Sequence, residues 1–319
     1  MPLPRPFAPL PGSVARPETR HLTFSQLTER FERLRQMQQL AFHCLHHRNA
    51  DNFIQQLDDR AKHPFAIRQG NTPLCGPAAF LFCVASAYPE AYKRYVLELA
   101  LYGEARLGKL RVIPSEACRN AQPKHGVIHP VDWAALASLR DSTNRLLSMR
   151  SAESNAAGIT LPSAMAAWFA ESGLFGSVEN HTRLFPGASA DTLLLADRKH
   201  RQGASVCLFV RASILAEAGV ELGSKLGKGT PKTLAPVPDH WIVQTAPMYL
   251  EHRQVPTPFE ALVGNEDIDV KTLPLDFSVH SWGERNEPRQ ISARINPMTL
   301  QKLLPYFYGF ISARPVQKS

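Results

Sequence analysis

The chain has 319 residues, of which 44% are hydrophobic and 20% charged, a composition typical of a globular protein with a sizeable core. It contains no run of about 18 apolar residues, so the sequence predicts no membrane-spanning helix. Its 36 Lys and Arg exceed its 28 Asp and Glu, which gives a net charge of +8. The basic residues are scattered along the chain, and we therefore do not expect it to bind nucleic acid.

Residues 1–20 contain six prolines and few residues that a core would bury, a composition typical of an extended, flexible arm. The arm lacks the apolar run of a Sec signal peptide, so we expect the chain to be made in the cytoplasm. The five cysteines are odd in number and widely spaced, which favours a reducing compartment over a disulfide framework. Because no paired Cys-x-x-Cys motif is present, we expect no metal, and nothing indicates a cofactor.

After the arm, the first half of the chain has the periodicity of helices, with apolar residues at steps of three and four. A loop at 62–73 leads into an apolar segment that is too long for a strand and predicts a buried helix. Pro77 falls in its first turn, where a missing N–H costs little. The predicted helices lie at about residues 23–60, 75–101, 130–149 and 162–172, with a small polar linker at 151–158.

The second half is richer in β-branched and aromatic residues, which favour strands. The predicted strands lie at residues 204–211, 240–245 and 275–281, with another candidate at 289–295. Asn296 and Pro297 are typical of a helix cap and a first helical residue, and predict the start of a last helix before 306–313 closes the chain. Helices followed by strands indicate an α+β fold.

Cys75 lies where the loop becomes the long apolar helix, in the segment Gln69-Gly-Asn-Thr-Pro-Leu-Cys-Gly-Pro77. A helix N-terminus carries a partial positive charge that favours a thiolate, so Cys75 is a candidate nucleophile. The alternative is a small apolar residue that starts a core helix. Cys83 and Cys207 lie in apolar runs and are expected to be core residues.

Two histidines lie at the ends of predicted strands. His240 opens one strand in Asp239-His-Trp-Ile-Val, and His280 ends a later one in Ser278-Val-His-Ser-Trp-Gly. Alternation along that later strand places Asp276, Ser278 and His280 on one face. Three polar groups on a half-buried face need partners.

These segments resemble the papain-like cysteine protease superfamily. Members have a glutamine six positions before the nucleophilic cysteine, as Gln69 stands before Cys75, and a histidine that opens a strand, often after an aspartate, as Asp239 and His240 do. The family's orienting residue lies in Asn-Ser-Trp-Gly, where this chain has His280-Ser-Trp-Gly. The order of these motifs along the chain is the same.

The chain departs from the family at two of these positions. Gly76 replaces the aromatic residue that usually follows the cysteine, and His280 replaces the asparagine, as in the Cys–His–His arrangement of a branch of cell-wall peptidases. The resemblance implies a papain-like fold, in which a helical subdomain carrying the cysteine helix packs on an antiparallel sheet carrying the histidine. It implies one catalytic domain at 21–319, with a helical half at about 21–200 and a strand-rich half at about 201–319.

The resemblance also implies a role for each residue. Cys75 is expected to attack a carbonyl carbon, His240 to serve as the base, and His280 to orient the ring of His240. The Gln69 amide, with the backbone N–H of Cys75, is expected to stabilise the oxyanion. Asn71 is a rival donor for the oxyanion, and Trp282 is expected to shield the two histidines from water. Gly76 and Asp239 are expected to line the site. If His280 is not the orienting residue, Asp276 and Asn265 are the next candidates.

The resulting expectation is a cysteine hydrolase that cleaves an amide bond in a protein or peptide. Two alternatives stay open: a deamidase that converts a glutamine of a target protein to glutamate, and an inactive binding module of the same fold. A basic domain with a Pro-rich arm and no secretion signal resembles toxin domains that bacteria deliver into other cells by specialised secretion. Such domains commonly have an immunity protein as a partner, which we expect here by analogy.

Overall fold

The computed structural model describes residues 22–46, 51–70, 72–123, 126–143, 160–183, 188–214, 238–281, 292–293 and 296–317, with the last two strands before Met298 described by their backbone alone. The predicted arm, the linker at 151–158, Asn71 and Trp282 lie outside these residues. The described chain combines helices with antiparallel sheet, which confirms the α+β class. None of the described helices is long and apolar enough to cross a membrane.

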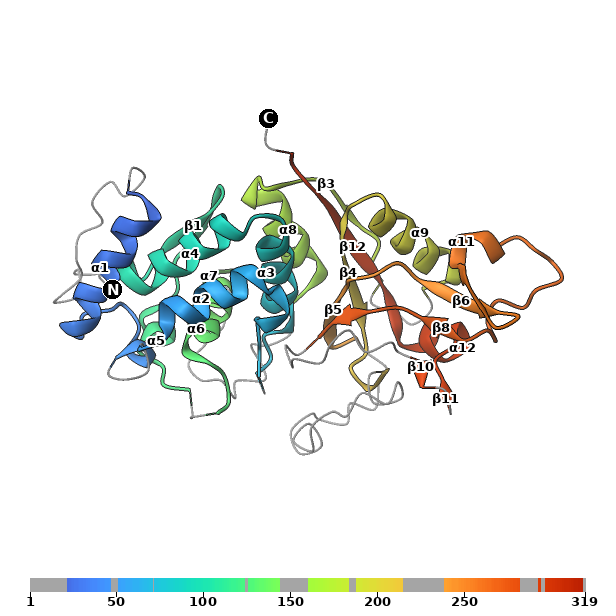
Figure 1. The fold of residues 1–319 in the computed structure, drawn as a ribbon, viewed down its shortest axis with the longest axis horizontal. Coiled ribbons are helices and arrows are strands. Elements are labelled where there is room, and N and C mark those ends of the chain that lie inside the picture. The colour runs from blue at the N-terminus through green and yellow to red at the C-terminus, as the bar shows by residue number, and fades with distance from the viewer. Residues whose placement is uncertain are drawn as a thin grey trace, which may run out of the picture.

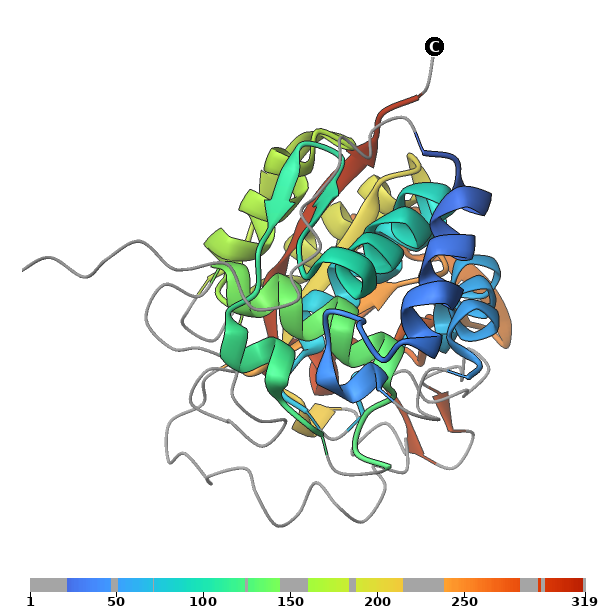
Figure 2. The same cartoon turned by 90° about the vertical axis from the view of Figure 1, so that its left-hand side faces the viewer.

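The helices of the first half lie together beside the main sheet (Figure 1), and Figure 2 views the molecule from their side, with the sheet behind them. They are α1 (Phe24–Gln36), α2 (Phe53–Lys62), α3 (Cys75–Ala87), α4 (Pro89–Tyr102), α5 (Glu116–Asn120), α6 (Pro130–Asp132), α7 (Ser138–Thr143) and α8 (Pro162–Ser172). A π-helical turn at Trp133–Ala137 joins α6 to α7, and 3-10 turns lie at His43–Leu45 and Pro64–Ala66.

Two of the predicted helices are each divided in the structure. The segment 23–60 contains α1, which begins at a capping box formed by Thr23 and Gln26, and α2, which follows a separate 3-10 turn. The segment 75–101 breaks at Tyr88, because Pro89 restricts the residue before it and starts α4 at its own first position. The break makes α3 short, and its residues from Cys75 to Ala85 are all buried.

Among the described residues, five antiparallel strands form the main sheet in the order β3-β12-β4-β5-β9. Their bounds are Phe175–Asn180 for β3, Ser205–Val210 for β4, His240–Gln244 for β5, Val279–His280 for β9 and Phe307–Pro315 for β12. The strands predicted at 204–211 and 240–245 are thus confirmed as β4 and β5. Strand β3 joins the sheet from the half of the chain, about 21–200, that we expected to be helical.

The main sheet is covered on both faces, so its strands alternate between two apolar clusters. In β5, Trp241 and Val243 pack into the cluster that contains α3, whereas Ile242 packs into the cluster that contains α9 (Ala190–Arg201). Helix α3 contacts β5 and β4 on the first face, and α9 contacts β4 and β12 on the second. The sheet therefore holds the first residues of β5 close to α3.

Smaller elements surround the main sheet. In the described chain β7-β6-β8 is a three-stranded sheet, β1 and β2 form a hairpin, and β10 pairs with β11. Their bounds are Ala105–Leu107 (β1), Leu110–Val112 (β2), Tyr249–His252 (β6), Val255–Pro258 (β7), Leu275–Asp276 (β8), Ser292–Ala293 (β10) and Asn296–Pro297 (β11), with helices α11 at Phe259–Leu262 and α12 at Leu300–Leu303.

Two predictions in the second half are wrong. The strand predicted at 275–281 is divided, because β8 belongs to the three-stranded sheet and β9 to the main sheet, so Asp276 and His280 do not share a strand face. Asn296 and Pro297 form strand β11 instead of starting a helix. The helix α12 begins later because Thr299 caps it, with its side chain accepting the backbone N–H of Lys302.

Candidate functional site

Cys75 is the first residue of α3 and only 5% of it is exposed. The N-cap residue, Leu74, provides no side-chain hydrogen bond, so no capping side chain competes for the first backbone N–H groups of the helix. Because α3 packs against β5, the Sγ atom of Cys75 lies 4.0 Å from the carbonyl oxygen of Asp239. The sulfur is thus placed against the backbone that leads directly into His240.

Gly76 is required by the close approach of Thr160. A Cβ atom at position 76 would lie 2.2 Å from the Oγ1 atom of Thr160, well inside van der Waals contact. The carbonyl oxygen of Thr160 also accepts a 2.8 Å hydrogen bond from the indole Nε1 of Trp241. Thr160 therefore links the start of α3 to β5, which gives a physical reason for glycine where the papain-like family has an aromatic residue.

His240 is the first residue of β5 and is 3% exposed. Its Nε2 atom shares a 2.8 Å hydrogen bond with the Oγ atom of Ser281, the residue that follows β9. The structure thus brings His240 together with Ser281, the one residue of the Ser-Trp-Gly segment that it describes. The residue that contacts this ring nitrogen, however, is Ser281, where we expected His280.

His280 is 4% exposed and lies opposite Val243 on the side of the sheet that faces α3. Its ring stacks on Phe82 of α3, with centroids 4.3 Å apart, and meets the edge of Phe65 at 5.8 Å. Phe82 follows Cys75 by seven residues, so both lie on one side of the helix. Among the described residues, the Nε2 atom of His280 has no hydrogen-bond partner.

Burial sets the charge state of the site. It raises the pKa of Cys75 to about 11, against smaller opposite effects of the backbone N–H groups of Trp241 and Gly76. It lowers the pKa of His240 to about 3, with a further contribution from nearby His280, whose pKa is also lowered to about 3 by burial. The expectation that the helix N-terminus favours a thiolate is therefore outweighed by desolvation, which favours the neutral forms of the thiol and of both imidazoles.

The loop before α3 holds the predicted oxyanion donor. Gln69 is buried, and its Nε2 donates to the carbonyl oxygen of Thr72 at 3.3 Å. In return the Thr72 hydroxyl donates to the carbonyl oxygen of Gln69 at 2.6 Å. One amide hydrogen of Gln69 thus stabilises the loop. Asn71, the rival donor, is among the undescribed residues, as is Trp282.

The other acidic and amide candidates have different surroundings. The Oδ1 atom of Asp239 accepts the backbone N–H of Ala212 at 2.7 Å, so its carboxyl group fixes the turn after β4. Asp276 lies in the three-stranded sheet, opposite Tyr249. Asn265 lies in an exposed turn, where its side chain accepts the backbone N–H of Asp267. None of these contacts involves the ring of His240.

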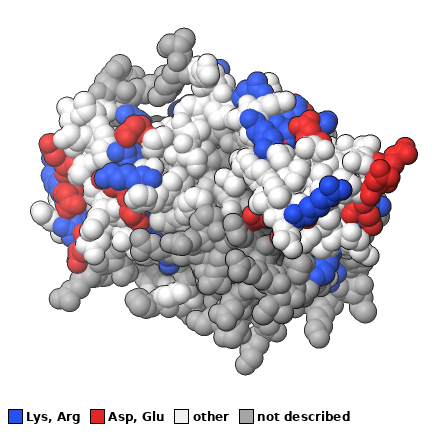
Figure 3. Space-filling view, turned by 45° about the vertical axis from the view of Figure 1, so that its right-hand side comes forward, with Lys and Arg blue, Asp and Glu red and all other residues white. Residues whose placement is uncertain are grey.

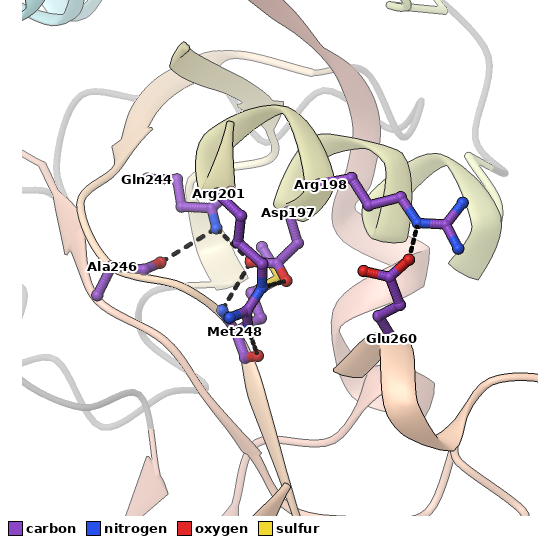
Figure 4. Close-up of polar contacts among 7 residues, drawn as sticks. All are labelled: Asp197, Arg198, Arg201, Gln244, Ala246, Met248 and Glu260. Atoms are coloured by element: carbon purple, nitrogen blue, oxygen red, sulfur yellow. Dashed lines mark hydrogen bonds and ion pairs between the residues drawn. The ribbon is translucent and has the colours of Figure 1, made fainter. Parts of the chain in front are cut away.

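A buried polar cluster at the other end of β5 was not foreseen from the sequence (Figure 4). Asp197 of α9 is fully buried and accepts hydrogen bonds from Gln244 Nε2 at 2.9 Å, from the backbone N–H of Met248 at 2.7 Å and from Arg201 Nε at 2.7 Å. These bonds attach the last residue of β5 to α9, four residues after His240. The spacing of Asp197 and Arg201 predicts a helical ion pair, but nothing in the sequence predicts the bonds to the strand.

Arg140 of α7 is a second residue that sequence reasoning missed. It is 9% exposed, and burial lowers its pKa while the negative charge of a Cys75 thiolate acts in the opposite direction. At Cys75 itself burial dominates, because the pKa of its thiol stays raised. In the described part of the chain, no group of three or more His, Cys, Asp and Glu side chains is arranged to hold a metal ion.

The surface carries mixed charge. On the face shown in Figure 3, basic and acidic side chains lie beside one another. At the end of α9, Arg198, Lys199 and Arg201 each pair with a carboxylate, from Glu260, Glu179 and Asp197 respectively. These basic residues are therefore already neutralised within the chain.

Comparison of the chain with models of known protein families, with curated proteins and with solved structures finds no match.

Proposed function

We propose that the chain is a papain-like cysteine hydrolase that cleaves an amide bond, with Cys75 as the nucleophile and His240 as the base. The observation that carries this proposal is the position of the Cys75 sulfur, 4.0 Å from the carbonyl oxygen of the residue before His240. A cysteine that starts a buried helix and lies against the start of a strand headed by histidine supports a Cys–His pair.

The reaction starts from a neutral pair, because burial favours the thiol and the uncharged imidazole. His240 takes the thiol proton as the sulfur attacks the carbonyl carbon of the substrate, and a tetrahedral oxyanion forms. His240 then gives this proton to the departing amine, which leaves a thioester on Cys75. Water hydrolyses the thioester to release the acid and regenerate the thiol.

The negative charges of this pathway have two groups of stabilising residues. The oxyanion would be held by the backbone N–H of Cys75, at the start of α3, and by the second amide hydrogen of Gln69. The thiolate would be stabilised by the buried guanidinium of Arg140. Donors that are already oriented toward the reacting atoms stabilise the negative charge that develops in the transition state.

The test compares Cys75→Ala with Cys83→Ala, a matched substitution at another buried cysteine of the same helix. Target-cell lysate and peptidoglycan are incubated with each protein and analysed by mass spectrometry. We expect new amide cleavage products with the wild type and with Cys83→Ala, and none with Cys75→Ala. Cys83→Ala should lose only about 1 kcal/mol of stability.

Other outcomes of this experiment decide between the alternatives. A gain of about one dalton on a target glutamine, without cleavage, would assign the chain as a deamidase. Equal amounts of product from the wild type and Cys75→Ala would contradict Cys75 as the nucleophile. Equal binding of a target by both proteins, without any product, would favour a binding module. Delivery into other cells and neutralisation by an immunity protein are part of the same proposal and depend on the same result.

A further inference from the structure

Two buried cysteines from distant parts of the chain meet between α3 and the main sheet. Cys83 of α3 and Cys207 of β4 are 124 residues apart in the sequence, and their Sγ atoms lie 3.8 Å apart. They are 2% and 0% exposed, and both are free thiols. We infer that Cys83 and Cys207 form a redox-sensitive latch, which a disulfide oxidant closes by linking α3 to β4. The inference does not depend on the proposed role of Cys75.

Strand register places Cys207 at the centre of the sheet face that α3 covers. Cys207 lies opposite Val243 of β5 on one side and opposite Ile311 of β12 on the other. Residues directly opposite each other on neighbouring antiparallel strands have their side chains on the same face. All three pack into the cluster that contains α3. Because β4 is the middle strand of the five, a bond to Cys207 would attach the helix to the centre of the sheet.

The position of α3 over this face is fixed by a second contact beside Cys83. The preceding residue, Phe82, stacks on the ring of His280 in β9. His280 lies opposite Val243, which lies opposite Cys207, so these three residues form one row across the sheet. Two successive residues of α3 thus meet two members of the same row, and these contacts set the distance between the two sulfurs.

The geometry requires only a small movement for bond formation. A disulfide has an S–S distance of about 2.05 Å, so the two sulfurs have to approach by about 1.8 Å. Rotation of a cysteine side chain about its Cα–Cβ bond moves the sulfur over such a distance. The bond would close a loop of 124 residues, and a long closed loop strongly restricts the unfolded chain. The linked chain should therefore unfold at a higher temperature than the dithiol.

The closing reaction is an exchange with a disulfide such as oxidised glutathione. The thiolate of one cysteine attacks a glutathione sulfur, which forms a mixed disulfide and releases one glutathione thiolate. The second cysteine then attacks the protein sulfur of the mixed disulfide and releases the other glutathione. Two protein thiols are oxidised to one disulfide, one glutathione disulfide is reduced to two thiols, and the two protons pass to the released glutathione.

Burial determines when this exchange takes place. The contact with Cys83, together with burial, raises the pKa of the Cys207 thiol well above its ordinary value. Little thiolate is therefore present in the folded chain, and neither sulfur is accessible to a bulky disulfide. We expect the latch to close while the chain folds in an oxidising compartment and to stay open in a chain that folds in a reducing one.

The experiment follows the bond and its effect on stability in the full chain. The reduced chain is unfolded in urea and refolded in buffers that differ in the ratio of oxidised to reduced glutathione. Remaining thiols are alkylated, and linked peptides are identified by mass spectrometry. We expect the Cys83–Cys207 pair to be linked in the oxidising buffer and unlinked in the reducing one. The thermal unfolding midpoint should be roughly 5–15 °C higher for the linked chain.

Three variants control the assignment. Cys83→Ala and Cys207→Ala should each have the same unfolding midpoint in the two buffers. Cys118→Ala, at another fully buried cysteine, should keep both the linked pair and the shift in midpoint. A Cys83–Cys207 link that forms at no glutathione ratio would overturn the inference, and so would a linked chain that unfolds at or below the midpoint of the reduced chain. The wild type in its two redox states provides this comparison even if a variant folds poorly.

A time course tests the step at which the latch closes. The folded, reduced chain is incubated with oxidised glutathione in the absence of urea, and linking is compared with that of the refolding chain. We expect the folded chain to remain a dithiol over the time in which the refolding chain becomes linked. Equally fast linking of the two samples would contradict closure during folding.

Discussion

Phe82 of α3 stacks almost flat against His280 of β9, with ring centroids 4.3 Å apart and planes inclined by 17°. The contact joins the helix that begins at Cys75 to the strand that precedes Ser281. Both rings are buried, so the contact is made by a neutral imidazole. Protonation of His280 would therefore disturb the packing of the site, even though His280 need not contact a substrate.

This relationship predicts how stability depends on pH. The pKa of His280 is lowered to about 3 in the folded chain, below its ordinary value of 6.5, so its stabilising effect is complete above pH 6.5 and is lost as the pH falls toward 3. Over that range one such group changes the free energy of unfolding by about 1.4 kcal/mol per pH unit. His280→Phe removes this term and keeps the ring stack.

Urea unfolding of the wild type and His280→Phe, measured between pH 7 and pH 4, tests this expectation. The two curves should converge or cross as the pH falls, because the variant loses stability less steeply. The pKa of His240 is lowered mainly by burial, which is common to both proteins, and the smaller contribution of His280 is lost in the variant, which makes its stability still less dependent on pH. Parallel curves would show that His280 is not buried as a neutral group.

The second prediction concerns the reactivity of Cys75. Because burial raises the pKa of its thiol to about 11, the thiolate fraction should increase tenfold with each pH unit from 7 to 9. The rate of alkylation by iodoacetamide, located at Cys75 by peptide mass spectrometry, should rise in parallel without a plateau. A plateau below pH 8 would instead indicate a preformed ion pair with His240. The urea-unfolded chain is the control, since its thiols titrate near a pKa of about 8.5.

The third prediction concerns the contact between Gly76 and Thr160. In a helix interior alanine is ordinarily favoured over glycine by about 1 kcal/mol. Here a Cβ atom would lie 2.2 Å from Thr160 Oγ1 and 2.4 Å from its Cβ, so Gly76→Ala should destabilise the chain by roughly 1–3 kcal/mol. The matched control is Gly176→Ala, because a Cβ there meets only Val316 Cγ2 at 3.8 Å. Equal unfolding midpoints for the two variants would contradict the close contact.

The start of α3 and the strands β4 and β5 could be predicted because their signals are local. Cys75 begins a wholly apolar segment with a proline in its first turn, and β5 alternates between two buried faces. The break at Tyr88 was missed because an apolar segment continues through it and Pro89 forms the first residue of a new helix. Helix periodicity alone does not distinguish one long helix from two.

The contacts within the site could not be predicted in the same way, because they depend on strand register. The pairing of Val243 with His280 determines which of two adjacent side chains meets His240, and these segments are about 40 residues apart. Strands β8 and β9 have two residues each, so their partners, and not their own propensity, decide which sheet they join. The sequence therefore indicated the segments around His240 and His280, but not that the side chain in contact with the His240 ring is Ser281.

The last prediction concerns Asp197, for which the neighbouring pair of Arg198 and Glu260 offers a control on the same helix (Figure 4). Asp197 is fully buried and accepts three hydrogen bonds, including one from Gln244 at the end of β5. Asp197→Asn replaces one acceptor oxygen by an NH₂ group and turns a donor toward donors, so we expect a loss of about 3–5 kcal/mol in the free energy of unfolding. Glu260→Gln breaks an exposed ion pair and should cost less than about 1 kcal/mol. Urea denaturation of both variants measures the difference.

Because Asp197 anchors the strand that His240 begins, Asp197→Asn should also broaden the His240 NMR signal, and Glu260→Gln should leave it unchanged. Equal stability of the two variants would mean that the end of β5 is not held by this carboxylate.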